Sequence, residues 1–361
     1  MNKAAEGKAI VYCEGAFNTP NGKTAHGLVR YTQRYNILSI IDSRYAGKDA
    51  GMILDGKNKG IPVFDRIEQA FNKAKSAGII ATHLVVGLAP DGGRLSSGAR
   101  EDIKEAITLG LNIDCGLHDY LSEDREISGL ASEHHVNIRD IRKPKPIDQL
   151  HFFSGKIDEV KALKVAVLGT DSAVGKRTTA RILTNALLEV GEKAEMIGTG
   201  QTAWLQGAQH CIVLDSIIND FVSGEIEHAV WSAWMDTKPD YIIIEGQGSL
   251  LNPAYPGGFE LLAAGRPDAI ILQHAPARID YDGFPGFCIH PLSDQIKAIE
   301  IISGKPVIAI TINHEKLDIK QIPFICDAIE MAVGLPTLDV LLEGADKLVK
   351  LLKLISKKRS V

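Results

Sequence analysis

The stretch Gly169-Thr170-Asp171-Ser172-Ala173-Val174-Gly175-Lys176-Arg177-Thr178-Thr179 decides the fold of the C-terminal half of this chain. Residues 163–168, which precede it, are largely apolar, and this predicts a buried strand. After it, apolar residues recur three or four positions apart from Ala180 to Val190, which predicts a helix that packs one face on a sheet. A glycine-bounded loop with a lysine and hydroxyl residues, placed between a strand and a helix, is typical of a phosphate-binding loop.

The phosphate-binding interpretation has a local physical basis. The first N–H groups of a helix have no intrahelical partners, and they carry the positive end of the helix dipole. Glycines let the main chain curl so that these groups converge on an anion, and a lysine adds a mobile positive charge. The alternative is a glycine-rich turn that binds nothing. We expect the cofactor-binding residues of this loop to be Gly169, Thr170, Asp171, Ser172, Gly175, Lys176, Arg177, Thr178 and Thr179.

Two features of the loop depart from the commonest phosphate-binding pattern. Five residues, rather than four, separate Gly169 from Gly175, and Arg177 stands where a Ser or Thr would ligate magnesium. The five-residue variant resembles the loop of dethiobiotin synthetase and its relatives. Thr178 offers a hydroxyl one residue late, but Arg177 weakens the case for magnesium-dependent nucleotide hydrolysis. Such a loop is also suited to the phosphates of a larger nucleotide cofactor such as coenzyme A.

Composition sets broad limits on the function. A chain of 361 residues with 45 % hydrophobic and 24 % charged residues is long enough for two globular domains. A net charge of −5 indicates no electrostatic preference for nucleic acid. The five cysteines form no Cys-x-x-Cys pair, so we expect no structural metal site. We find neither a signal peptide nor an apolar run near the ~20 residues that span a bilayer, and we expect a cytoplasmic protein without a membrane partner.

The first half of the chain alternates strand-like and helix-like segments. Such alternation implies parallel strands in a doubly wound sheet, so we expect a Rossmann-like N-terminal domain. The predicted strands are residues 9–12, 37–41, 83–88 and 112–117, and the predicted helices begin at Ile67 and Ala99. Weaker site candidates are Asp42, the Gly22-Lys23-Thr24 turn and the possible anion-binding loop at residues 89–94.

The basic, proline-punctuated stretch at residues 139–146 is the best domain boundary. It predicts a Rossmann-like domain over residues 1–145 and a P-loop NTPase-like domain over residues 146–361. The second domain is also expected to be of the α/β class, with a doubly wound parallel sheet.

Glu245 is the second strong signal in the C-terminal half. Residues 241–244 form an apolar strand that delivers this acid to its carboxyl end, followed by Gly246 and a glycine-rich turn. In a phosphate-loop fold, this is where a second acid holds a metal ion or a water near the phosphates. The alternative is that Glu245 only caps the turn that follows it. We count Glu245 as a catalytic candidate and Gly246 as part of the cofactor site.

Several other polar residues follow predicted strands. Gln201 lies in a stretch suited to hydrogen bonding a ligand, and Asp215 follows a short apolar run. His274 ends the predicted strand 269–274, and a neutral imidazole suits proton transfer near pH 7. Each of these residues has an equally simple structural interpretation as a cap or a hydrogen-bonded core residue. A further helix is expected to start at Glu225, and Glu225 and Glu227 are interpreted as partners of its dipole.

Taken together, these motifs resemble a two-domain bacterial and archaeal family long classed as a domain of unknown function. The resemblance is carried by residues 169–179, by Thr199-Gly200-Gln201-Thr202, by Asp215 with residues 220–222, and most strongly by residues 245–250 with 253–255. Characterised members of that family are D-glutamate N-acetyltransferases that use acetyl-CoA. The resemblance therefore implies acyl transfer from a thioester to an amine. Asn252 stands where the family's pattern leads us to expect His, so we expect no catalytic role there.

Three hypotheses follow from the sequence. The first is an N-acetyltransferase that uses acetyl-CoA and an amino acid such as D-glutamate, with Glu245, His274 or Asp215 in catalysis and Arg94, Arg100 or Arg278 pairing with substrate carboxylates. The second is an ATP- and magnesium-dependent ligase or kinase of the dethiobiotin synthetase type, with Glu245 and Asp171 near the metal. The third is a nucleotide-binding protein without turnover. We expect a small-molecule substrate and a homo-oligomer.

Overall fold

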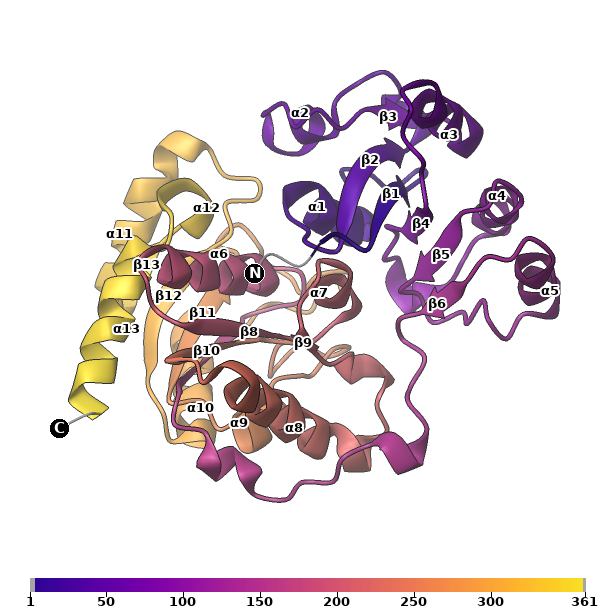
Figure 1. The fold of residues 1–361 in the computed structure, drawn as a ribbon. Helices are drawn as coiled ribbons and strands as arrows, with labels where there is room; N and C mark the ends of the chain where they lie inside the picture. Colours follow the sequence, from indigo (N-terminus) through magenta and orange to yellow (C-terminus); the bar gives the residue numbers. More distant parts are fainter. Residues whose placement is uncertain (1–3, 360–361) are drawn as a thin grey trace. The chain divides into compact units, whose positions relative to one another are not determined.

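The computed structural model describes residues 4–359, which form two compact units, each built on one parallel sheet (Figure 1). The N-terminal unit extends to Pro144 and also includes Gln201–Ala208. The C-terminal unit consists of Lys145–Gly200 and of the chain from Gln209 onward. Both sheets have helices packed on both faces, so the predicted α/β class and the two doubly wound parallel sheets are confirmed.

The sheet of the N-terminal unit has the strand order β3-β2-β1-β4-β5-β6. Apolar side chains from one face pack with α3, α4 and α5, and those from the other face pack with α1 and α2. The strands are β1 (Gly7–Tyr12), β2 (Tyr35–Ile41), β3 (Val63–Phe64), β4 (His83–Val86), β5 (Asn112–Cys115) and β6 (Ile138–Asp140). The helices are α1 (Lys23–Arg30), α2 (Ala50–Asp55), α3 (Ile67–Ser76), α4 (Ser97–Thr108), α5 (Arg125–Glu133) and α7 (Gln201–Leu205).

Helix α7 joins the N-terminal unit although it follows the first strands of the other unit in sequence. Leu205 is fully buried in the core beneath α1. The side-chain amide of Gln206 donates to the carbonyl oxygens of Gly27 and Tyr31, at 2.7 and 2.9 Å. Thr202 and Thr24 share a hydroxyl–hydroxyl bond of 2.9 Å. This segment therefore completes the packing of α1.

The sheet of the C-terminal unit has the order β13-β12-β11-β7-β10-β8-β9. Its central strand, β7, leads directly into the phosphate-binding loop. The strands are β7 (Leu163–Gly169), β8 (Ala194–Gly198), β9 (His210–Cys211), β10 (Tyr241–Glu245), β11 (Ala269–His274), β12 (Val307–Ile312) and β13 (Thr337–Leu338). The helices are α6 (Lys176–Glu189), α8 (Asn219–Thr237), α9 (Phe259–Gly265), α10 (Leu292–Ser303), α11 (Ile322–Val333), α12 (Val340–Glu343) and α13 (Asp346–Arg359).

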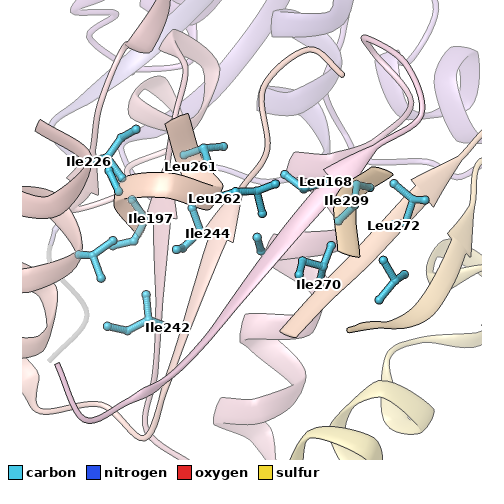
Figure 2. Packing of buried hydrophobic residues seen from close by; sticks show 14 of the residues in the cluster. Leu168, Ile197, Ile226, Ile242, Ile244, Leu261, Leu262, Ile270, Leu272 and Ile299 are labelled. Atoms are coloured by element: carbon cyan, nitrogen blue, oxygen red, sulfur yellow. The ribbon is translucent and has the colours of Figure 1, made fainter. Parts of the chain in front are cut away.

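Two hydrophobic layers hold this second sheet. On one face, Ile242, Ile244 and Leu168 pack with Ile226, Leu261 and Ile299 of the covering helices (Figure 2). On the other face, α6 and α13 supply the apolar residues. Near-continuous apolar strands are expected for a parallel sheet covered on both sides. The layers leave only the strand ends free to carry polar side chains.

The start of α8 differs from the sequence interpretation. The helix begins at Asn219, so Glu225 and Glu227 lie in its interior rather than at its start. Both side chains are buried, and they accept hydrogen bonds from the backbone N–H groups of His151 (2.8 Å) and Ser154 (2.6 Å). Glu225 and Glu227 therefore fix the segment around His151 and Ser154 to α8, and they are not dipole partners. Within residues 4–359, no helix has both the length and the apolar character needed to span a membrane.

Candidate functional site

The phosphate-binding loop connects β7 to α6 at the carboxyl edge of the second sheet. Gly175 has φ 111° and Ala173 has φ 51°, both in the left-handed region. Left-handed residues among right-handed ones turn successive N–H groups toward one side of the loop, which makes a concavity suited to an anion. The N-terminus of α6 adds the positive end of its dipole. The local backbone is therefore that of an anion site.

Lys176 is held across the mouth of this loop. Its ammonium donates to the carbonyl oxygens of Asp171 and Gly248, each at 2.7 Å. A Cβ atom added to Gly169 would lie 2.9 Å from the Nζ of Lys176, so a larger residue there would displace the lysine side chain. The lysine thus ties the loop to the turn after β10. Its charge is placed at the anion site with the stem buried.

The carboxylate of Asp171 organises the loop from beneath. It is fully buried. Its Oδ1 accepts from the N–H of Ser172 (2.6 Å) and from the side-chain amide of Asn252 (2.8 Å). Its Oδ2 accepts from Arg278 (2.8 Å) and from the N–H of Asp282 (2.8 Å). Four donors occupy the two oxygens, so this carboxylate fixes protein groups in place.

The arginines that the sequence offered for substrate carboxylates are engaged with acidic residues. Arg278 pairs with both Asp171 and Glu315. Arg100 pairs with Asp124 and Glu126. The guanidinium of Arg94, on a side chain that is 83 % exposed, lies 3.7 Å from Asp119. The structure therefore gives each of these arginines a protein partner.

Hydroxyl groups connect the loop and α6 to strand β11. The hydroxyl of Thr179 donates to the side-chain oxygen of Gln273, which also accepts from Thr311 at 2.6 Å. The N–H of Thr170 donates to the carbonyl oxygen of Gln273 at 2.9 Å. Thr179 is buried, whereas Thr178 is half-buried. Thr179 is therefore used to fix α6 to the sheet.

Glu245 ends β10, directly beside the phosphate-binding strand. It pairs in register with Val167 of β7, and its Oε2 accepts from the N–H of Thr199 at 3.1 Å. The side chain is only 6 % exposed, and burial raises the pKa of its carboxyl above the ordinary value of 4.5. Nearby cations oppose this shift; they are, in order of effect, Arg177, Lys176 and Arg181. The site thus holds a buried carboxylate next to several positive charges.

Gly246 allows the turn after β10 to lie close to strand β7. A Cβ atom there would lie 2.4 Å from the carbonyl oxygen of Val167, so a larger residue would push the turn away from β7. Gln247 follows and donates its side-chain amide to the carbonyl oxygen of Thr199. The ends of β7, β10 and β8 are therefore connected through short polar contacts.

His274 lies at the end of β11, on the opposite side of the loop from β10 in the strand order. Its Nδ1 is 3.0 Å from the hydroxyl of Thr170. Burial lowers the pKa of His274 to about 4, so the imidazole is neutral at pH 7. The histidine contacts the loop, but it is a weak base.

Two further candidates lie elsewhere. Asp215 is exposed and lies in a 3-10 turn, Leu214–Ser216, whose Leu214 N–H is 3.3 Å from the carbonyl oxygen of Thr199. Gln201 begins α7 in the N-terminal unit, where its side chain covers Gly116: a Cβ atom on that glycine would lie 2.7 Å from Cγ of Gln201.

The weaker candidates of the N-terminal unit have structural partners. Asp42 is fully buried, and it accepts from the N–H of Phe17 at 2.8 Å and from the guanidinium of Arg44 at 2.7 Å. Lys23 and Thr24 begin helix α1. Asp42 therefore fixes the turn after β1 to the end of β2.

Sequence reasoning assigned no site role to Asn252, Gln273 or Ser249, although Ser249 lies in the motif at residues 245–250. Asn252 and Gln273 act through contacts with residues far away in sequence, so no local pattern reveals them. Ser249 is 2 % exposed, and its hydroxyl has no hydrogen-bond partner among the described residues. It lines a small cavity beside Gly169 that also contacts Gln295. A buried hydroxyl without a partner is costly, and such groups often mark a place for a water or a ligand.

Comparisons with known proteins agree with this architecture. Residues 151–349 match the family described as a domain of unknown function (DUF1611_C), P-loop domain. Residues 43–144 match the corresponding N-terminal family (DUF1611_N), a Rossmann-like domain. A solved structure of a DUF1611 family protein from Anabaena variabilis superposes with a TM-score of 0.86 and 28 % identity, covering 95 % of this chain and 98 % of that one.

Two curated relatives carry functional names. A D-glutamate N-acetyltransferase from a Pseudoalteromonas species is 32 % identical over 282 residues, which cover 76 % of this chain and 82 % of that protein. A D-glutamate N-acetyltransferase from Tritonibacter scottomollicae is 29 % identical over 293 residues, covering 78 % and 84 %. The resemblance stated from the motifs is therefore confirmed at the level of the family.

Proposed function

The chain belongs to the DUF1611 family, and on that basis we propose that it is an N-acetyltransferase that transfers the acetyl group of acetyl-CoA to the amine of an amino acid such as D-glutamate. The names of its two curated relatives support the reaction class. The observation that carries the proposal is the buried carboxylate of Glu245 beside an anion-binding loop. The proposed site combines a proton acceptor, Glu245, with a phosphate-binding loop at the carboxyl edge of the C-terminal sheet.

The loop fits the phosphates of the acyl donor. The left-handed residues Ala173 and Gly175 shape an anion concavity, and Lys176 carries a positive charge at its mouth. The ammonium now bound to the carbonyl oxygens of Asp171 and Gly248 would turn to a phosphate oxygen, a stronger acceptor because it is charged. Bound acetyl-CoA supplies a thioester, whose C–S bond breaks as the acceptor nitrogen forms a C–N bond.

Glu245 removes the proton that blocks this step. An amino acid carries an ammonium group at neutral pH, and this nitrogen becomes nucleophilic only when a base accepts its proton. Burial raises the pKa of Glu245, which makes the carboxylate a better base than an exposed glutamate. His274, whose pKa burial lowers to about 4, is a poorer base, and Asp215 is exposed. We therefore assign the general-base role to Glu245.

The alternative is an ATP- and magnesium-dependent ligase or kinase. The five-residue loop and the acid at the end of β10 favour it. Arg177 at the usual magnesium-ligand position is against it, as is the carboxylate of Asp171, whose oxygens accept four hydrogen bonds from the protein. We rank this alternative second.

Release of free thiol from acetyl-CoA tests the proposal. The assay uses D-glutamate and then a panel of D- and L-amino acids, each with and without magnesium. We expect thiol release that depends on an amino-acid acceptor, needs no magnesium and falls sharply in Glu245→Gln. Magnesium-dependent formation of ADP from ATP, with no thiol release for any acceptor, would instead establish the alternative.

A further inference from the structure

A small cavity lies between the end of β7, the turn after β10 and helix α10. Its walls include Gly169 at the end of β7 and Ser249 in the turn. From α10 they include Gln295, Ala298 and Ile299, which are three and four residues apart along the helix and therefore share one face. The space open to the centre of a water-sized group is about 10 Å³, so the cavity has room for one such group.

Ser249 contributes a hydroxyl group to this cavity. The residue is 2 % exposed, and its Oγ has no hydrogen-bond partner within the part of the chain that the structure describes. An unpaired buried hydroxyl destabilises the folded state unless a bound water or ligand forms a hydrogen bond with it. The backbone of Ser249 is fixed, because its N–H donates to Tyr255 (3.2 Å) and its carbonyl oxygen accepts from Gly257 (3.1 Å). The turn therefore holds the hydroxyl in place for a small acceptor.

The walls of the cavity suit an uncharged oxygen rather than an anion. Apart from Ser249, the described residues that line it are glycines, two glutamines and apolar residues, and none of them carries a charge. A phosphate or carboxylate group is ionised at neutral pH, and burial in such surroundings would be costly. The carbonyl oxygen of a thioester is neutral before the reaction and gains negative charge as an amine attacks. A fixed hydroxyl donor in apolar surroundings stabilises that developing charge.

The cavity adjoins the phosphate-binding loop and the acid at the end of β10. The carbonyl oxygen of Gly248, in the same turn, accepts from the ammonium of Lys176 at 2.7 Å. Gln247 lines the cavity, and its side-chain amide donates to the carbonyl oxygen of Thr199, whose N–H donates to Glu245. The arm that joins the phosphates of CoA to its thioester is a flexible chain, so it can fold back to reach this place.

We propose that Ser249 donates a hydrogen bond to the carbonyl oxygen of the acetyl thioester, which this cavity receives. The inference rests on the proposed function, because it names the acyl subsite of the same reaction. The acceptor nitrogen forms a C–N bond to the carbonyl carbon, and an electron pair of the C=O bond moves to the oxygen held by Ser249. When the C=O bond re-forms, the C–S bond breaks and CoA leaves as a thiolate, while the proton of the amine passes to Glu245.

Ser249→Ala tests this role, because it removes the hydroxyl and little else. With acetyl-CoA and D-glutamate, we expect kcat to fall about 100-fold, as for loss of one donor to a developing oxyanion. The dissociation constant for CoA should change less than about twofold. The midpoint of thermal unfolding should not fall, because the substitution removes an unpaired buried hydroxyl. A kcat within about twofold of the unmodified value, whatever the midpoint, would overturn the inference, because the cavity would then hold a structural water only.

Ala298→Val tests the cavity itself. The larger side chain fills the space from α10, so we expect the same loss in kcat as in Ser249→Ala. The double variant should lose no more than about threefold beyond either single variant, because both substitutions remove one and the same hydrogen bond. Losses that multiply in the double variant would overturn the inference. Ala328→Val is the matched control: this alanine is exposed on α11, and its substitution should leave kcat unchanged.

Calorimetric titration with acetyl-CoA and with CoA separates this inference from the proposed function. We expect the unmodified protein to bind acetyl-CoA about 2- to 10-fold more tightly than CoA, the range for one neutral hydrogen bond. Ser249→Ala and Ala298→Val should each abolish this difference. That result supports the acyl subsite even if no acceptor is acetylated. If no acceptor is acetylated, equal affinities for the two ligands, or binding of neither, overturn the subsite.

Discussion

The side-chain amide of Asn252 donates a 2.8 Å hydrogen bond to Oδ1 of Asp171, across 81 residues of sequence, and both side chains are buried. The carbonyl oxygen of the same Asn252 side chain accepts from the N–H groups of Ala254 and Tyr255. Asn252 therefore connects the turn after β10 to the floor of the phosphate-binding loop. The hydrogen bonds of Asn252 thus hold this turn against the loop.

Asn252→Asp should destabilise the protein. The change replaces a donor with a carboxylate next to the buried carboxylate of Asp171, so two like charges would meet without solvent. We expect a loss of roughly 3 kcal/mol in the free energy of unfolding at pH 7, measured by urea denaturation. Asn219→Asp, an exposed change at the start of α8, is the control and should lie within about 0.5 kcal/mol of the unmodified protein. Equal stability of the two variants would contradict this role.

Lys176→Met should weaken binding of CoA. The substitution keeps an unbranched apolar stem but removes the ammonium that the loop places at its mouth. We expect the dissociation constant for CoA, measured by calorimetry, to rise about 10- to 150-fold, which corresponds to about 1.5–3 kcal/mol for a charge-assisted bond. Lys193→Met provides the exposed control. A change below twofold in Lys176→Met would show that this loop does not hold the cofactor phosphates.

Glu245→Gln should remove activity and change how stability depends on pH. As the general base is lost, we expect kcat to fall at least about 100-fold. Burial raises the folded-state pKa of Glu245, so this group favours folding when protonated, and its contribution is lost as pH rises through the folded pKa. The variant should therefore gain stability relative to the unmodified protein between pH 5 and pH 8. A constant difference across that range would argue against the raised pKa.

His274→Gln should matter for stability at acid pH more than for catalysis. Burial lowers the folded-state pKa of His274 to about 4 from 6.5. As pH falls from 6.5 toward 4, the unfolded chain binds a proton at this histidine while the folded protein does not, so the free energy of unfolding decreases. At pH 5 this loss amounts to roughly 2 kcal/mol for the unmodified protein. The variant should not show it in urea denaturation at pH 7 and pH 5. A kcat loss equal to that of Glu245→Gln would instead identify the histidine as the base.

Gln206→Ala should destabilise the N-terminal unit. The substitution removes the side-chain amide that Gln206, the residue after α7, donates to the carbonyl oxygens of Gly27 and Tyr31. We expect a loss of about 1–3 kcal/mol, with faster amide hydrogen exchange in α1 than in α6. Gln209→Ala, an exposed neighbour, is the control. Unchanged exchange in α1 would show that the segment adds little to that unit.

Local patterns were enough to predict the principal elements of both sheets. The apolar runs of the core strands, such as residues 241–244, are uninterrupted, and each core strand is covered on both faces. The edge strands β3, β6, β9 and β13 were not predicted, because each has only two or three residues, too few to show a periodicity. The start of α8 was misplaced by six residues because its first turns carry no clear amphipathic pattern.

The sequence by itself determined the phosphate-binding loop and the acid at the end of β10. Both follow from residues that are consecutive in the chain: a strand, then glycines, then a helix start, or an apolar strand, then an acid. Only the tertiary structure decided how these groups are used. It paired Asp171 with Asn252 and Arg278, attached Lys176 to Gly248, and gave Gln201–Ala208 to the N-terminal unit. Such contacts join residues far apart in the chain, and they are fixed by packing that no local spacing encodes.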